Sequence, residues 1–235
     1  TAISERCLAF ADHKVGVCRL IVPTGGGKTL SSLRFAVKYC EKYEKKHIFY
    51  IAPFMSILEQ NSDVIKEIAG EENFLEHYSD FSQSLKNDNE LAEYELRTEK
   101  WDLPVISTTL VQFLNAIFSA QTACVRRFHQ LSCSVIIIDE IQAIPLKCIN
   151  LFNLAVNFLS QICEATIILC TATQPCLEKT EFPILFDKIE DMNKLFTDDF
   201  KIFHRTNLIS KCRLESYTYQ EAAEFCAGRF EEEGS

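Results

Sequence analysis

The sequence lacks the features of membrane and secreted proteins. None of its apolar runs reaches the ~18 residues that a membrane-spanning helix needs, and the longest, such as Val135 to Ile138, are strand-sized. Residues 1–16 alternate charged and apolar side chains, and we expect no signal peptide there. With 47% hydrophobic residues, the 235-residue chain has enough apolar material for one α/β domain and a short extension. We therefore expect a cytoplasmic protein without membrane contact.

Cysteine and histidine spacings that bind metals or form disulfide frameworks are also missing. The 11 cysteines include no CxxC pair, and the five histidines show no ligand spacing. An odd number of cysteines in apolar surroundings predicts buried free thiols in a reducing compartment. The cysteines with such surroundings are Cys18, Cys40, Cys163, Cys170 and Cys226.

The sequence has no excess of basic residues. Its 24 Lys and Arg residues against 33 Asp and Glu residues give a net charge of −9. A simple DNA-binding domain obtains most of its affinity from a basic surface, so the charge argues against that class. A motor that holds a single strand in a cleft shared with other domains is compatible with it. The one compact basic cluster, Arg126, Arg127 and His129, is interpreted either as a DNA contact or as a solvated turn.

Strand-like apolar segments alternate with helical segments along the chain. Strands are predicted at residues 19–22, 47–52, 103–109, 134–140 and 165–173. The alternation predicts an α/β fold, with a mostly parallel sheet flanked by helices on both faces. Helical spacing predicts one buried face formed by Leu30, Leu33, Val37 and Cys40, and a helix near residues 149–163 buried on two sides, the second formed by Leu151, Leu154 and Phe158.

Two segments depart from this alternation. Residues 71–100 are polar and acidic, which predicts a mobile helical insertion or surface arm. After Pro175 the pattern weakens, with a strand predicted at 213–219 and a helix at 220–233. We expect residues 1–210 to form one domain and residues 211–235 to form a connector. A chain that begins without Met and ends in EEEGS is expected to be a fragment of a longer protein.

The segment Val22 to Thr29 (VPTGGGKT) follows a strand and opens a helix, as a phosphate-binding loop does. Its glycines let backbone N–H groups turn toward phosphates, and the helix beginning near Lys28 adds its positive dipole end. Lys28 is expected to reach the β and γ phosphates of ATP, and Thr29 to ligate Mg²⁺. The first Gly of the usual GxxxxGK[ST] pattern is replaced by Val22. The predicted phosphate-binding residues are Thr24, Gly25, Gly26, Gly27, Lys28 and Thr29.

Two adjacent carboxylates end the apolar strand in IIIDEIQ, residues 136–142. Buried charges need a partner, and Mg²⁺ provides one for Asp139. Glu140 is expected to polarise the water that attacks the γ-phosphate. Lys28 and Asp139 are far apart in the sequence, but parallel strands bring their carboxyl ends to one sheet edge. The segment Thr171 to Thr173 ends another strand and is expected to contact phosphate and DEIQ.

Five segments, in order, resemble motifs I, Ia, Ib, II and III of superfamily 2 helicases: VPTGGGKT, IAPFMSILEQN, ISTTLVQF, IIIDEIQ and CTATQP. The resemblance runs from about Cys7 to Pro175. Within the superfamily, the chain most resembles the helicase part of the CRISPR-associated helicase–nuclease of type I interference systems. DEIQ, TATQP, SILEQN and TTLVQF carry this narrower resemblance, which is less specific than the helicase one.

The resemblance implies a RecA-like P-loop NTPase fold with the motif III strand between the phosphate-loop and DEIQ strands. It implies that Gln142, Thr171, Ala172 and Thr173 couple the nucleotide state to strand movement. A single-stranded DNA path would be lined by Pro53, Ser56, Gln60, Asn61, Thr108, Thr109, Gln112 and Phe113. The alternative interpretations are a core position for Phe113 and a helix-surface amide for Asn61.

By the same resemblance, the chain is the ATP- and Mg²⁺-binding motor domain of a single-stranded DNA translocase, recruited by an RNA-guided surveillance complex of the Cascade type. The family's nuclease uses a His-Asp metal site, and no His-Asp dipeptide occurs here. The nuclease and the second RecA-like domain are therefore expected elsewhere in the intact protein, and the fragment is expected to hydrolyse ATP poorly. The alternatives are an RNA or DNA-repair helicase core, and an ATP-binding docking module that uses residues 71–100.

Overall fold

The computed structural model describes residues 2–23, 25–78, 88–172, 177–185, 189–193 and 218–233. The chain divides into two compact units, residues 1–203 and 204–235. In the second unit the helix α9 spans Tyr219–Glu233, close to the predicted helix, and most of the predicted strand at 213–219 lies outside the described residues. No helix in the described parts of the chain combines the length and apolarity needed to cross a membrane.

A seven-stranded sheet forms the centre of the first unit. Its strands are β1 Val17–Ile21, β2 Ile48–Ala52, β3 Phe74–His77, β4 Val105–Thr109, β5 Val135–Ile138, β6 Thr166–Thr171 and β7 Glu190–Asp191. They are ordered β3-β4-β2-β5-β6-β1-β7, and every neighbouring pair is parallel. The predicted α/β fold with a parallel sheet is therefore confirmed.

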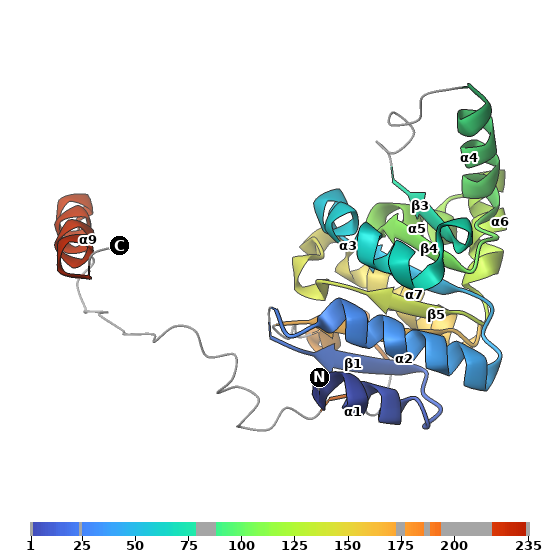
Figure 1. Ribbon diagram of the computed structural model, residues 1–235, viewed down its shortest axis with the longest axis horizontal. Coiled ribbons are helices and arrows are strands. Elements are labelled where there is room, and N and C mark those ends of the chain that lie inside the picture. Colours follow the sequence, from blue (N-terminus) through green and yellow to red (C-terminus); the bar gives the residue numbers. More distant parts are fainter. Residues whose placement is uncertain are drawn as a thin grey trace. The chain divides into compact units, whose positions relative to one another are not determined.

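Helices cover both faces of this sheet. The first core cluster packs α1 (Ala2–Phe10), α2 (Lys28–Tyr43) and α3 (Met55–Ala69) on one face. The second packs α5 (Leu110–Phe118) and α7 (Ile149–Gln161) on the other, where α4 (Asp88–Lys100) and α6 (Thr122–Leu131) continue the layer (Figure 1). Alternate strand residues supply the two clusters, so that Tyr50 and Ile137 face one and Ile51 and Ile138 face the other. This double burial explains the near-continuous apolar strands.

The segment 71–100 contains a strand of the sheet that was not predicted. After a short 3-10 turn at Glu71–Asn73, β3 pairs with β4 in the register Phe74↔Val105 and is buried along its whole length. Its charged residue, Glu76, pairs with Lys66 of α3 at 2.7 Å. A charged residue interrupts the apolar pattern of this strand, and the partner that makes its burial possible lies on another element. The strand could therefore not be recognised from an apolar pattern. Only α4 fits the predicted helical surface arm.

The predicted buried faces of α2 and α7 are partly wrong. In α2, Leu30 and Val37 are 53% and 48% exposed, because the buried stripe centres on Phe35 and Tyr39, whose rings stack 5.2 Å apart. In α7 one apolar face is buried, as predicted, but the second is not. The exposed residues of that second face are Leu151, Leu154 and Phe158, and the buried ones of the first include Phe152, Val156 and Leu159.

All nine described cysteines are free thiols. Cys18 and Cys170 are buried as predicted, and Cys7 and Cys124 are buried as well. Burial raises the pKa of the Cys7 thiol to about 11. Cys226 is exposed on α9, and Cys40 and Cys163 are only half-buried, which corrects the prediction that these three are buried.

Candidate nucleotide-binding site

The predicted phosphate-binding loop connects β1 to α2. Gly25 and Gly27 adopt left-handed backbone conformations, with φ of 81° and 77°, and the Gly26 N–H donates to the Pro23 carbonyl at 2.9 Å. A Cβ at Gly27 would meet no atom within 4 Å, so this backbone conformation, rather than a lack of room, requires glycine. The loop thus leaves open space in front of the α2 N-terminus, which begins at Lys28. Thr24 lies outside the described residues.

The two carboxylates of DEIQ follow β5 directly. Asp139 is buried, and its N–H donates to the Ile51 carbonyl of β2 at 2.8 Å. Glu140 has a left-handed backbone, with φ of 50°, and its N–H donates to Asp139 Oδ1 at 2.9 Å. Both carboxylates reach the ammonium of Lys28, the residue that directly follows the phosphate-binding loop.

Lys28 joins the loop to these carboxylates. Its ammonium lies 2.9 Å from Asp139 Oδ1 and also contacts Glu140 Oε1. Burial acts to lower the pKa of Lys28, but the charge of Asp139 and the hydrogen bonds to both carboxylates outweigh it and raise the pKa. Lys28 therefore carries a full positive charge at the point where the two predicted catalytic carboxylates meet.

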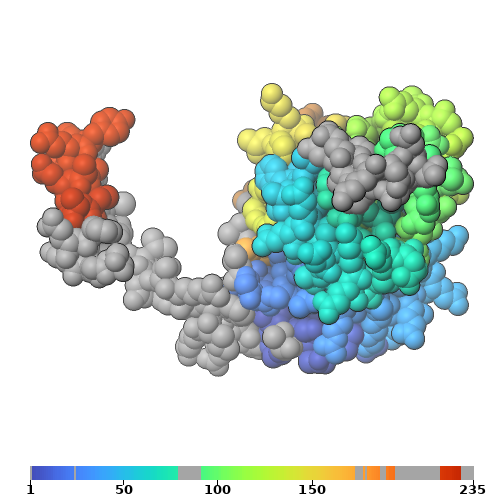
Figure 2. Space-filling model, turned by 45° about the horizontal axis from the view of Figure 1, so that its top comes forward, coloured from blue at the N-terminus to red at the C-terminus, as the bar shows by residue number. Residues whose placement is uncertain are grey.

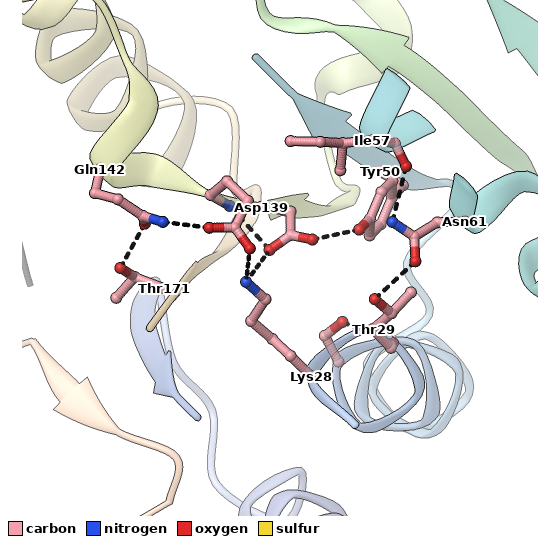
Figure 3. Close-up of polar contacts among 10 residues, drawn as sticks. Lys28, Thr29, Tyr50, Ile57, Asn61, Asp139, Gln142 and Thr171 are labelled. Atoms are coloured by element: carbon pink, nitrogen blue, oxygen red, sulfur yellow. Dashed lines mark hydrogen bonds and ion pairs between the residues drawn. The ribbon is translucent and has the colours of Figure 1, made fainter. Parts of the chain in front are cut away.

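Two further side chains fix the polar groups of the site. The Tyr50 hydroxyl donates to Asp139 Oδ2 at 2.5 Å, and the Thr29 hydroxyl donates to Asn61 Oδ1 at 3.1 Å (Figure 3). Tyr50 was not predicted as a site residue. A tyrosine inside an otherwise apolar buried strand signals a hidden partner, because a buried hydroxyl needs a hydrogen bond.

The residues predicted to couple the site to motif III are in contact. Gln142 Nε2 donates to Glu140 Oε2, and the Thr171 hydroxyl donates to Gln142 Oε1 at 2.7 Å (Figure 3). The strand that carries Thr171, β6, lies between β1 and β5, as the resemblance implied. Ala172 follows it directly, and Thr173 lies outside the described residues.

The structure buries some of the residues predicted to contact a nucleic-acid strand and leaves others at the surface. Phe113 and Thr108 are fully buried, Phe113 in the core and Thr108 with its hydroxyl donating to the His77 carbonyl, so the prediction for these two is corrected. Thr109 caps α5 by accepting from the Gln112 N–H at 3.3 Å. Nucleic-acid contact stays a prediction for Thr109, which is buried, and for the residues that keep exposed surface: Pro53, Ser56, Gln60, Asn61 and Gln112.

The basic cluster predicted near residue 127 lies on α6 rather than in a turn. Arg127 is partly buried, donates to the Thr98 carbonyl at 2.7 Å and lies over the Trp101 ring, so it ties α6 to α4. Arg126 is exposed and pairs with Glu99 at 3.1 Å.

The donor set suits Mg²⁺ shared with phosphate. A hydroxyl, Thr29, and two carboxylates line a pocket of about 480 Å³, together with the glycine loop, Gln60 and Asn61. No group of three or more His, Cys, Asp or Glu residues that could hold a metal by itself occurs among the described residues. Mg²⁺ needs no such cage, because it takes one or two protein oxygens and completes its shell with phosphate oxygens and water.

The fold and the site define a P-loop nucleotide-binding domain. The sequence profile described as DEAD/DEAH box helicase matches residues 3–181, and the chain belongs to this family. A comparison with curated protein sequences found no match.

Solved structures share the fold at low sequence identity. T. fusca Cas3 with AMPPNP matches with a TM-score of 0.57 and 18% identity over 72% of this chain and 21% of that chain. T. fusca Cas3 with ATP gives 0.55 and 18% over 70% and 20%. The DUF1998 helicase MrfA bound to DNA and AMPPNP gives 0.55 and 17% over 75% and 24%. The chain thus spans about a fifth to a quarter of the length of these proteins.

Proposed function

We propose that this chain is the first RecA-like motor domain of an ATP-dependent single-stranded DNA translocase or helicase. The observation that carries the proposal is the convergence of Lys28, Thr29, Asp139 and Glu140 around one pocket at the carboxyl edge of the sheet. Membership in the DEAD/DEAH box helicase family supports the motor assignment.

The residues of the site divide the work of ATP hydrolysis. The glycine loop and the α2 N-terminus receive the phosphates, and Lys28 turns from Asp139 toward the β and γ phosphates. Thr29 and Asp139 hold Mg²⁺, which when bound offsets the phosphate charge. Glu140, aimed into the site by its left-handed backbone, orients and polarises the attacking water. Gln142 and Thr171 pass changes at Glu140 to β6.

We further propose that the intact protein acts in CRISPR interference in the cytoplasm. The DEIQ, SILEQN, TTLVQF and TATQP segments and the shared fold with T. fusca Cas3 support this narrower assignment. The proposed partners are single-stranded DNA, an RNA-guided surveillance complex of the Cascade type, a second RecA-like domain and a metal-dependent nuclease domain. Residues 211–235 are proposed to lead toward the second motor domain. A basic surface on these other parts would compensate for the charge of −9.

Nucleotide binding tests the motor proposal on this chain. A fluorescent ATP analogue with Mg²⁺ should bind the wild-type protein, and Lys28→Ala should weaken binding by about 10- to 100-fold, the value of charge-assisted hydrogen bonds to phosphate. Lys38→Ala is the control, because Lys38 lies on the same helix but contacts Leu8 and Asp12 away from the loop. Unchanged binding in Lys28→Ala would refute the phosphate-site assignment.

The alternative functions are separated by other measurements. Hydrolysis by the intact protein that is stimulated by RNA more than by single-stranded DNA would favour an RNA helicase. For a docking module, deleting residues 71–100 is not a clean test, because it removes β3 from the sheet. Charge reversal of the exposed Glu95 on α4 should leave the sheet intact. Loss of partner capture with normal nucleotide binding would favour docking.

A further inference from the structure

We propose that Tyr50 and Asn61 are positioning residues that hold Asp139 and Thr29 in the orientation that binds Mg²⁺ with ATP. The inference rests on the proposed nucleotide site and adds residues to it. Tyr50 was not predicted as a site residue, and Asn61 was predicted to line the path of a nucleic-acid strand. Both contact a predicted magnesium ligand directly.

Tyr50 fixes the orientation of the Asp139 carboxylate. β2 lies beside β5, with Tyr50 paired to Ile137, and the tyrosine hydroxyl reaches Asp139 Oδ2 at 2.5 Å. The other oxygen, Oδ1, accepts from the Glu140 N–H and lies 2.9 Å from the Lys28 ammonium. The two oxygens therefore have different partners, and the carboxylate cannot rotate without breaking contacts.

Asn61 fixes the direction of the Thr29 hydroxyl. A hydroxyl has one proton and two lone pairs, and Thr29 gives its proton to Asn61 Oδ1 at 3.1 Å. With its proton given to Asn61, the Thr29 oxygen, which also lies near the Tyr50 hydroxyl, can offer a lone pair to a cation. The Asn61 amide is itself oriented, because Nδ2 donates to the Ile57 carbonyl at 2.8 Å and this places Oδ1 toward Thr29 (Figure 3). Partners of this kind contribute about 10- to 100-fold to metal affinity in proteins.

Both contacts come from a single strand–helix unit. Tyr50 lies on β2 and Asn61 on α3, and the turn that joins them contains Pro53, a predicted nucleic-acid contact. α3 adjoins α2, which begins with Lys28 and Thr29 (Figure 2). Movement of this unit would shift the partners of both predicted magnesium ligands together. A nucleic-acid strand that contacts the turn at Pro53 would therefore affect cation binding through β2 and α3 alone.

Magnesium titrations of nucleotide binding test the inference. Binding of the fluorescent ATP analogue is measured against Mg²⁺ concentration for the wild type, Tyr50→Phe and Asn61→Ala. We expect both variants to need about 10-fold more Mg²⁺ for half-maximal binding, while binding without Mg²⁺ changes little. A general loss of packing would weaken binding with and without Mg²⁺ alike, so this split separates positioning from structure.

Matched controls remove a similar hydrogen bond elsewhere. Tyr39→Phe deletes a buried tyrosine hydroxyl that donates to the Val15 carbonyl at 3.1 Å. Asn73→Ala deletes an amide that donates to the carbonyl four residues earlier, as Asn61 does. Both controls should keep the wild-type Mg²⁺ requirement. A wild-type Mg²⁺ requirement in Tyr50→Phe and Asn61→Ala, with binding still lost in Lys28→Ala, overturns the inference alone. Binding that Lys28→Ala leaves intact overturns the proposed function instead.

Discussion

A buried histidine at the sheet edge should make the stability of this protein fall steeply in mild acid. His77 on β3 is only 8% exposed, and its Nδ1 accepts from Trp101 Nε1 at 3.1 Å. An accepting ring nitrogen requires a neutral ring. Burial, together with the positive charge of Arg127, lowers the pKa of His77 to about 3 from its ordinary 6.5.

The sign and size of the effect follow from proton linkage. Between pH 6.5 and 3 the unfolded chain binds a proton at this histidine that the folded chain does not bind, so stability is lost as the pH falls through this range. Each pH unit in this range costs about 1.4 kcal/mol. From pH 7 to pH 5 the contribution of His77 amounts to about 2 kcal/mol of unfolding free energy.

Urea denaturation at pH 7 and pH 5 measures this contribution. His77→Gln keeps an acceptor for Trp101 but does not titrate, so its loss of stability between the two pH values should be about 2 kcal/mol smaller than that of the wild type. His129 is exposed on α6 and faces water in both the folded and unfolded chain, so His129→Gln is the control. Equal losses in His77→Gln and the wild type would refute the buried, neutral histidine.

Three other changes test burial and contacts at α7 and the site. Phe152→Ala should cost about 3–5 kcal/mol of unfolding free energy, whereas Phe158→Ala, at a 43% exposed position, should cost less than about 1.5 kcal/mol; equal costs in urea denaturation would contradict the assignment of faces. Lys28→Ala should lower the free energy of unfolding by about 3 kcal/mol, because it leaves buried Asp139 without its cation. The same substitution should cost clearly less in an Asp139→Asn background. A double-mutant cycle without coupling would count against this ion pair. Thr171→Val should cost about 1 kcal/mol and keep nucleotide affinity, so weakened nucleotide binding would speak against a role confined to coupling.

The central strands and the phosphate loop were predictable because local sequence determines them. A four-residue apolar run such as Val135 to Ile138 favours a strand buried on both faces, and glycines before Lys28 favour a loop with left-handed backbone. The rule that parallel strands present their carboxyl ends at one edge then brings Lys28 and Asp139 together without further information.

The parts that were not predicted depend on partners far away in the sequence. β3 pairs with β4 and buries Glu76, whose charge is offset by Lys66 of α3, and no local pattern shows that pairing. The buried face of α2 is set by aromatic packing around Phe35, which helical spacing of aliphatic residues does not reveal. Asn61 lines the pocket beside Thr29 rather than lying only on a helix surface, because α3 packs beside α2. Spacing gives the period of a helix, but tertiary packing selects its face.

The charge balance around Asp139 links the two halves of the site. Asp139 is almost fully buried, and its carboxylate is stable there because the Lys28 ammonium lies 2.9 Å away. If Lys28 turns to ATP phosphates, Asp139 needs another cation at the same moment, and Thr29 and Asp139 offer the oxygen donors that Mg²⁺ prefers. Nucleotide without Mg²⁺ would draw Lys28 away and leave a buried charge unpaired. Under the proposed function, the same buried carboxylate would lower the cost of binding Mg²⁺–ATP and penalise ATP alone, so we expect the metal and the nucleotide to bind as a pair.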